Sequence, residues 1–183
     1  MAARPDQSRV APASCRLEPF CTEWSQRLVS WVGDAREAYW LAPKTPPPLT
    51  ADGVAGWRMA GHDQYMLMAV LGQPPIGYGE LNRMDAGWRS YWLGHLIVDP
   101  AERGRGYGVQ LTRLLLREAF VGRGARRVTL VVFPQNRAAV ACYRTAGLRD
   151  DGYEVHEFAG YGQREGLLRM AANGPPRDRT SSI

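Results

Sequence analysis

A loop rich in glycine and arginine stands where an apolar stretch of the chain gives way to an amphipathic one. Residues 98–108 read Val-Asp-Pro-Ala-Glu-Arg-Gly-Arg-Gly-Tyr-Gly. Glycine has no Cβ atom, so backbone N–H groups at the start of a following helix can close on a bound anion. The helix dipole favours negative charge there, and Arg103 and Arg105 add positive charge. The loop, whose glycines are Gly104, Gly106 and Gly108, therefore predicts a phosphate-binding site.

Two common nucleotide-binding patterns do not fit this loop. The dinucleotide fingerprint G-x-G-x-x-G requires a glycine where Val109 stands. The P-loop requires a lysine after its last glycine, and the only lysine of the chain is Lys44, far upstream. The pattern that remains is R-x-x-G-x-G, running from Arg103 to Gly108.

A second pattern follows one expected helix and one expected strand later. It begins at Asn136, contains Tyr143 and ends at Gly147 and Leu148, which matches N-x-x-A-x-x-x-Y-x-x-x-G-[FL]. Asparagine can cap a helix and glycine can end one. Seven residues make about two helical turns, so the asparagine and the tyrosine should lie on one face of that helix.

The two motifs, in this order and at this separation, resemble those of the GNAT superfamily of acyl-CoA-dependent N-acyltransferases. The resemblance covers residues 62–170, with a fainter echo before them. It implies an α/β fold with a central mixed sheet of six to seven strands flanked by about four helices. It also implies acetyl-CoA as co-substrate, an amine as acceptor and no metal ion.

The resemblance assigns roles to individual residues. The backbone of Leu96, Ile97 and Val98 would bind pantetheine, and Asn136 would hydrogen-bond the same arm. Tyr143 would protonate the thiolate that leaves when a neutral amine attacks the thioester. The pyrophosphate would bind Arg103, Gly104, Arg105, Gly106, Tyr107 and Gly108.

The general base stays open. Trp92 and Val131 occupy positions where some members of the superfamily carry a glutamate. The candidates in this chain are Glu80, His95 and Glu154, each on a different expected strand. Otherwise the amine arrives already neutral.

Hydrophobic periodicity places these motifs on alternating elements. The helix over 106–120 should bury Leu111, Leu114, Leu115 and Ala119, and the strand over 127–133 should be covered on both faces. The proline-rich segment 43–48 should be extended, as a connector or a lid over the acceptor. Asp34 should cap a helix that ends at Leu41. Further helical segments are expected from Thr22, within residues 50–60 and over 136–147. Strands are expected over 15–20, 64–71, 76–81, 88–98, 127–133, 148–154 and 162–170.

Length and composition predict one domain. The chain has 183 residues, 45% of them hydrophobic, and we expect a domain over 14–172 between flexible tails at 1–13 and 173–183. No apolar run approaches the ~20 residues that cross a bilayer, and no signal-peptide core is visible. A cytoplasmic protein is therefore expected, without membrane contact. The three cysteines Cys15, Cys21 and Cys142 lack the spacing of a zinc site or a disulfide framework.

The net charge of +5 fits attraction of a polyanionic co-substrate. Nucleic acid is not an expected partner, because no run of five basic residues occurs and aromatic residues are not interleaved with basic clusters. We expect a monomer or a homodimer. A non-catalytic acyl-CoA sensor is the alternative to an enzyme, but such a binder would have less need of Tyr143.

Aromatic side chains are concentrated in the regions that the resemblance assigns to the acceptor cleft. Most should lie in the core, and those that line the groove would favour a partly apolar or cationic acceptor. They are Trp24, Trp31, Tyr39, Trp40, Trp88, Tyr91 and Trp92.

Overall fold

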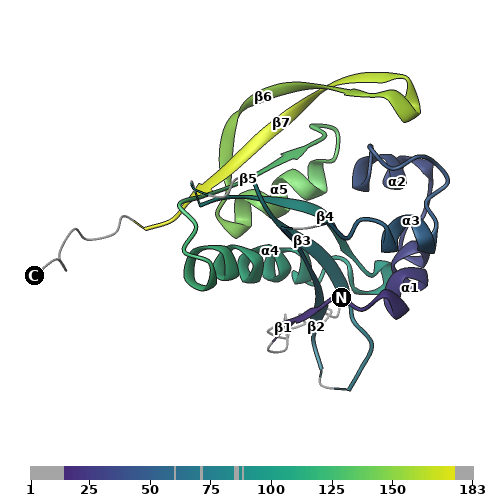
Figure 1. Ribbon diagram of the computed structural model, residues 1–183, viewed down its shortest axis with the longest axis horizontal. Coiled ribbons are helices and arrows are strands. Elements are labelled where there is room, and N and C mark those ends of the chain that lie inside the picture. Colours follow the sequence, from purple (N-terminus) through teal and green to yellow (C-terminus); the bar gives the residue numbers. More distant parts are fainter. Residues whose placement is uncertain (1–14, 60, 71, 85–86, 88, 176–183) are drawn as a thin grey trace, which may run out of the picture.

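A seven-stranded mixed sheet with the strand order β1-β2-β3-β4-β5-β7-β6 organises the chain (Figure 1). The computed structural model describes residues 15–59, 61–70, 72–84, 87 and 89–175. The strands are β1 (Arg16–Pro19), β2 (His62–Met68), β3 (Gly77–Arg83), β4 (Ser90–Val98), β5 (Arg127–Val132), β6 (Arg149–Phe158) and β7 (Gln163–Asn173). All neighbours are antiparallel except β4 and β5, which the helical crossover makes parallel. The expected sheet of six to seven strands is confirmed.

Five α-helices accompany the sheet in the described part of the chain. They are α1 (Ser25–Ser30), α2 (Ala35–Leu41), α3 (Ala51–Ala55), α4 (Tyr107–Arg117) and α5 (Arg137–Ala146). A π-helical turn (Glu118–Gly122) continues α4, and short 3₁₀ turns span Thr22–Trp24, Pro100–Glu102 and Ala159–Tyr161. In this part of the chain no helix is long and apolar enough to cross a membrane.

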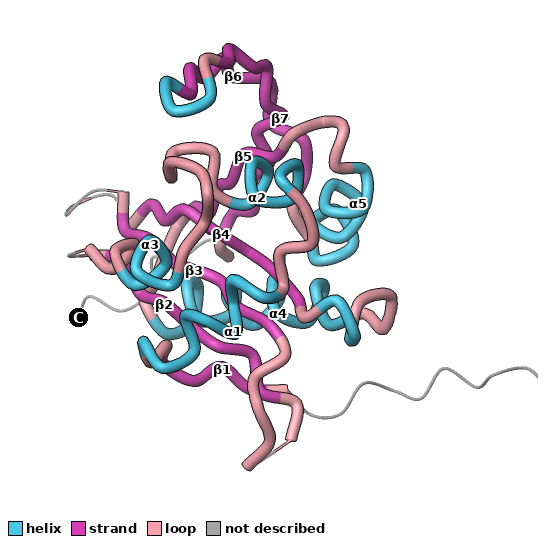
Figure 2. The backbone as a smooth tube through the Cα atoms, turned by 90° about the vertical axis from the view of Figure 1, so that its right-hand side faces the viewer, coloured by secondary structure: helices cyan, strands magenta, loops and turns pink. Residues whose placement is uncertain are grey.

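Alternation along β2 shows why helices lie on both faces of the sheet. Leu67 is buried in the cluster that joins the sheet to α4 and α5. Its neighbours Met66 and Met68 point the other way and pack with residues of α1 and α3. Successive residues of a strand face opposite sides, so both sides of this strand are covered. Figure 1 shows α4 on one side of the sheet and α1 and α3 on the other, and Figure 2 looks onto the α1 and α3 side.

The helix caps expected from the sequence are confirmed. The Asp34 side chain accepts a hydrogen bond from the Glu37 N–H at 2.8 Å, which starts α2. The Asn136 side chain accepts one from the Ala139 N–H at 3.2 Å and starts α5. Gly147 then ends α5 with a φ of +116°, a left-handed conformation that favours glycine.

Two helix and strand faces differ from expectation. Leu111, Leu115 and Ala119 are buried as expected, but Leu114 is only half-buried. Thr112 and Leu116 are buried as well, so the buried stripe of α4 is rotated. The Thr112 hydroxyl is satisfied by donating to the Gly108 carbonyl at 2.8 Å, which lets a polar residue be buried. β5 alternates between buried and half-buried residues, because α2 and the β6–β7 hairpin cover its second face only near Val131.

The proline-rich segment 43–48 is not fully extended. The Thr45 N–H donates to the Ala42 carbonyl at 2.9 Å and closes a turn directly after α2. The Trp57 indole N–H donates to the Thr45 hydroxyl at 2.8 Å, so a hydrogen bond joins this segment to the residues that follow α3. These bonds give the segment the contacts of a packed connector rather than of a lid.

The two ends of the chain and five single residues lie outside the described residues. These include the expected N-terminal tail, most of the C-terminal tail, Ala60, Leu71, Asp85, Ala86 and Trp88. β7 includes Asn173, which the sequence assigned to the C-terminal tail.

Leu115 tests the main cluster. Its side chain is fully buried, so Leu115→Ala should lower the free energy of unfolding by about 2 to 5 kcal/mol through lost burial and a cavity. Urea unfolding followed by circular dichroism measures this. Leu114→Ala, on the half-buried side of the same helix, is the control and should cost less than half as much. Equal losses would contradict the packing described for α4.

Candidate active site

The two central strands, β4 and β5, separate after three paired residues. β4 and β5 pair only from Ser90 to Trp92, opposite Arg127 to Thr129. Beyond Trp92, β4 continues to Val98 beside β3, and β5 continues to Val132 beside β7. A V-shaped gap therefore opens in the middle of the sheet, and its β4 edge carries the residues expected to bind pantetheine.

Backbone groups of β4 point into this gap. The Asp99 N–H donates to the Ile76 carbonyl at 2.9 Å on the β3 side. Because N–H groups alternate along a strand, those of Leu96 and Val98 point to the opposite, open edge. The Val98 carbonyl on that edge accepts a hydrogen bond from the Arg103 Nε at 3.1 Å. The open edge thus offers unpaired donors to an extended ligand.

The gap leads to the N-terminus of α4, which no side chain caps. Gly106 is the N-cap and has a φ of +83°. The first helical hydrogen bond runs from the Gln110 N–H to the Gly106 carbonyl at 3.1 Å, so the N–H groups of the first turn before Gln110 have no helical acceptor. No atom lies within 4 Å of a Cβ built on Gly104 or Gly106. Free donors and open space together fit an anionic group such as a pyrophosphate.

The arginines of this loop are occupied by protein partners. Arg103 donates from Nη1 to the Glu37 carboxylate at 2.5 Å and from Nη2 to the Trp31 carbonyl at 3.0 Å. Arg105 pairs with Glu102 at 2.9 Å on the surface. What the loop presents to a phosphate is therefore chiefly its backbone.

Gly108 has a packing role that the sequence did not reveal. A Cβ there would lie 3.1 Å from the Cys142 sulfur, so the absence of a side chain lets α4 and α5 approach each other. Burial raises the pKa of the Cys142 thiol, which keeps it protonated. It is therefore a packing residue and a poor nucleophile.

Asn136 and Tyr143 lie on α5, as expected. The Asn136 carbonyl oxygen is used in the helix cap, which leaves its amide N–H groups to donate elsewhere. Tyr143 is half-buried and packs against the main cluster. Its hydroxyl has no hydrogen-bond partner among the described residues. Burial, with a smaller effect of Cys142, raises the pKa of Tyr143, so the phenol keeps its proton.

Two of the three candidate bases meet. The Glu80 carboxylate is buried, with 1% of its side chain exposed, and its Oε1 lies 2.9 Å from the His95 Nδ1. Tyr78 donates to Oε1 at 2.6 Å, and Asn82 donates to Oε2 at 3.0 Å. A histidine on β4 and a glutamate on β3 thus form a dyad inside a polar network.

A β-bulge brings this contact about. Tyr78 pairs with Ile97, yet Glu80 pairs with Gly94, so β4 has one residue more than β3 over this interval. The bulge lies at His95, whose φ of +47° is a strained conformation for a non-glycine residue. Its ring stacks on Trp57, with centroids 4.0 Å apart and planes at 12°. No sequence pattern indicated the role of Trp57, because the contact joins distant segments.

The network controls the charge of Glu80. Burial alone would raise its pKa, but the contact with His95 and the hydrogen bonds from Asn82 and Tyr78 outweigh burial and lower the pKa to about 2. Glu80 is therefore a stable anion and a weak base. It is suited to hold the imidazole so that its other nitrogen, Nε2, accepts a proton.

Glu154 belongs to another network. Its carboxylate contacts the His156 Nε2 at 2.9 Å and accepts a hydrogen bond from the Arg169 Nη1 at 2.8 Å. Burial opposes ionisation here as well, but these cations lower the pKa of Glu154. The structure brings Glu80 and His95 together and places Glu154 in a separate cluster of the β6–β7 hairpin.

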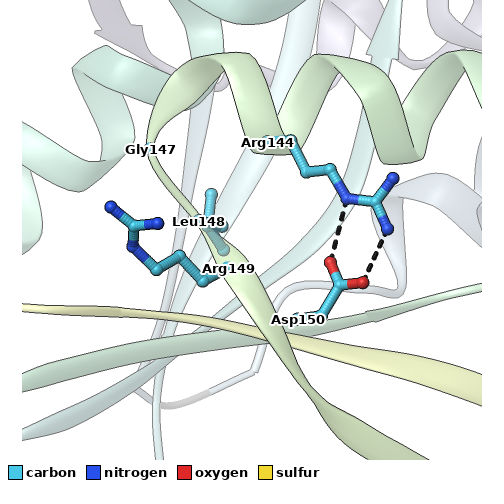
Figure 3. Close-up of a pocket in the computed structure, with 5 residues that line it drawn as sticks. All are labelled: Arg144, Gly147, Leu148, Arg149 and Asp150. Carbon is cyan, nitrogen blue, oxygen red and sulfur yellow. Dashed lines mark hydrogen bonds and ion pairs between the residues drawn. The ribbon is translucent and has the colours of Figure 1, made fainter.

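The surface has one hollow beside α2 and another at the C-terminal end of α5. One, of about 370 Å³, lies between α2, the end of β5 and β7. Its lining residues are Arg36, Tyr39, Trp40, Phe133, Gln135 and Glu165. The other, of about 360 Å³, lies at the C-terminal end of α5, away from Asn136, where Arg144 and Asp150 form an ion pair (Figure 3). In the described residues no group of three or more potential metal ligands occurs.

Comparison with known proteins identifies the family. Residues 15–148 match the profile of the Acetyltransferase (GNAT) family. The chain belongs to this family. The match covers both motifs and both residues of the Glu80–His95 dyad.

Individual relatives of this GNAT chain share no more than about a third of their residues with it over the aligned part. It is 30% identical over 96 residues to the thialysine N-epsilon-acetyltransferase of Sus scrofa, which covers 49% of this chain and 56% of that enzyme. It is 28% identical over 75 residues to the spermidine N(1)-acetyltransferase of Escherichia coli K12, covering 41% of this chain and 40% of that enzyme. The matches thus span about half the length of these curated relatives.

Solved structures show the same fold as this GNAT chain. The spermidine N-acetyltransferase from Vibrio cholerae, in complex with CoA and spermine, superposes with a TM-score of 0.72 at 19% identity, covering 87% of this chain and 95% of that one. The aminoglycoside acetyltransferase AAC(6')-Ib in complex with coenzyme A gives 0.66 at 18% identity, with 87% and 95% covered.

Gly106→Asp tests the anion site of this GNAT domain. The change puts a carboxylate against the free N–H groups of α4, so calorimetric titration should detect no CoA binding. Gly61→Asp is the control, because Gly61 has the same φ of +83° and also faces open space. The control should bind CoA like the parent chain. Unchanged affinity of a folded Gly106→Asp variant would contradict the site.

Proposed function

We propose that this chain transfers the acetyl group of acetyl-CoA directly to a primary amine of a small molecule or of a peptide N-terminus. The observation that carries the proposal is the gap between β4 and β5, which ends at the uncapped N-terminus of α4. Membership of the GNAT family supports it. So do the acetyltransferase relatives, which acylate amines according to their names.

The free edge of the gap suits a long, thin arm with a phosphate at one end. Leu96 and Val98 would donate backbone N–H groups to pantetheine, and Asn136 would donate from its amide. The loop from Arg103 to Gly108 would surround the pyrophosphate with backbone N–H groups. Acetyl-CoA supplies an activated thioester, and the chain supplies position and proton transfer.

The proton path follows from the dyad. The acceptor nitrogen attacks the thioester carbonyl, and its excess proton passes to the His95 Nε2, directly or through one water. Glu80 holds the opposite nitrogen of the ring and stabilises the imidazolium. A C–N bond forms and the C–S bond breaks. Tyr143 gives its proton to the departing sulfur, which avoids a bare thiolate in a poorly solvated gap.

A non-catalytic acyl-CoA sensor remains the alternative function. The contact between the buried Glu80 and the half-buried His95 favours an enzyme, because ionising a carboxylate away from water is costly and CoA binding does not require it. The test is release of free thiol from acetyl-CoA with a panel of primary amines. Tight CoA binding without thiol release from any amine would establish the sensor.

Tyr143→Phe tests the acid. The ring and its packing remain but the proton is lost, so kcat should fall roughly 10²-fold while the KM for acetyl-CoA changes little. Tyr153→Phe, at a tyrosine of β6 that is 71% exposed, is the control and should keep full activity. Full kcat in Tyr143→Phe would refute the assignment, as would an acetyl group trapped on Cys142 and seen by mass spectrometry.

His95→Ala tests the base. The variant should lose more than about tenfold in kcat/KM, together with the acidic limb of the rate–pH profile that a general base produces. Glu80→Gln should lower kcat/KM by a similar factor, because the His95 ring is then no longer held by a carboxylate. Because the pKa of Glu80 is lowered to about 2, its own titration lies far below the limb.

The matched control for the dyad is His156→Ala. His156 also contacts a glutamate at 2.9 Å but belongs to the β6–β7 hairpin. Its removal should leave the pH profile unchanged. Parent-like profiles in both His95→Ala and Glu80→Gln would instead show that the amine loses its proton in solution.

A further inference from the structure

We infer that the hollow between α2 and β7 binds a second, distal ammonium group of the acceptor, so that the preferred acceptors are diamines or longer polyamines. This inference rests on the proposed function, because it names the substrate class of the same transfer reaction. It is carried by an aromatic wall, an unpaired carboxylate and an unpaired phenol that share one hollow.

The wall is a cluster of aromatic rings around Tyr39 of α2. The Tyr39 ring centroid lies 4.9 Å from that of Phe133, 5.7 Å from that of Phe158 and 4.6 Å from that of Tyr161. Trp40, the next residue of α2, also lines the hollow. Aromatic faces attract cations, and a site partly shielded from water strengthens the attraction.

Glu165 supplies a negative charge without a partner. The β6–β7 hairpin carries five carboxylates, and four have a cation nearby: Asp150, Asp151, Glu154 and Glu157. Glu165 is half-buried, lines the hollow and has no ion pair or hydrogen bond among the described residues. A partly buried carboxylate is stabilised by a cation, and here a ligand can provide it.

The Tyr39 hydroxyl is the third element. Its oxygen is buried and has no hydrogen-bond partner within the described part of the chain. Such groups are rare in folded proteins, because an unpaired buried hydroxyl is costly. An ammonium group has three N–H donors, enough for both this oxygen and the Glu165 carboxylate once a small side-chain movement uncovers the oxygen.

The hollow adjoins the proposed transfer site. Phe133 and Gln135 lie between the end of β5 and Asn136, at the side of the gap opposite Leu96 and Val98. α2 also carries Glu37, which holds Arg103 of the phosphate loop. An acceptor that extends from the gap toward α2 therefore brings its far end to the hollow.

Arg36 is the competing cation of this hollow. It lines the same space but is exposed, so water and salt screen its charge more than that of the half-buried Glu165. If Arg36 dominated instead, the distal group of the acceptor would be a carboxylate. The test must therefore separate these two charges.

The test uses three amines with the same four-carbon chain: butylamine, aminobutyrate and diaminobutane, repeated with longer chains. Thiol release from acetyl-CoA gives kcat and KM for each. The diamine should have a KM about tenfold lower than the monoamine, as expected for a partly shielded charge contact with aromatic support. Equal values for diamine and monoamine at every chain length, or a preference for the amino acid, would overturn the inference.

Variants locate the effect. Glu165→Gln should raise the KM for the diamine about tenfold and leave that for the monoamine unchanged. Tyr39→Phe should raise it by a smaller factor. Glu157→Gln is the control, because Glu157 lies on the same hairpin, pairs with Arg164 in the register next to Glu165 and has a side chain that is 80% exposed.

The outcomes separate this inference from the proposed function. No thiol release from any amine would refute the proposed function. Thiol release with all amines and no diamine preference would refute only the distal ammonium site. A diamine preference that survives Glu165→Gln would also refute it, because another part of the protein would then bind the distal ammonium group.

Discussion

The separation of β4 from β5 after Trp92 is the constraint on which the structure depends. Each strand keeps a full partner on its other side, β3 for β4 and β7 for β5, so the gap costs few sheet hydrogen bonds. It leaves backbone donors on an edge in the middle of the fold, where they are normally paired. Both helices that follow the gap begin at its edges, so their N-termini and Tyr143 are brought to one place.

Near this gap, electrostatics is supplied more by backbone and buried networks than by exposed side chains. Arg103 joins the loop to α1 and α2, which leaves the uncapped turn of α4 for the anion. Likewise, the negative charge of Glu80 is held by Tyr78, Asn82 and His95 rather than by an arginine. Fixed donors of this kind need little rearrangement when a charge arrives.

Features encoded by neighbouring residues were predictable from the sequence. The caps at Asp34 and Asn136 and the glycine-rich loop depend on local hydrogen bonds and backbone angles. The bulge at His95, its contact with Glu80 and its stacking on Trp57 depend on strand register and on a distant segment, which no local pattern encodes. The same holds for the partner of Arg103 and for the contact of Gly108 with Cys142.

The ion pair between Glu37 and Arg103 gives α2 two duties. One side of this seven-residue helix anchors the loop after β4, while Tyr39 and Trp40 form a wall of the neighbouring hollow. Because the ion pair with Arg103 fixes α2 beside the phosphate loop, the positions of Tyr39 and Trp40 are coupled to that loop. A redesign of the hollow can therefore change Tyr39, Trp40 and the β6–β7 hairpin, but a helix grafted in place of α2 must keep an acid at position 37.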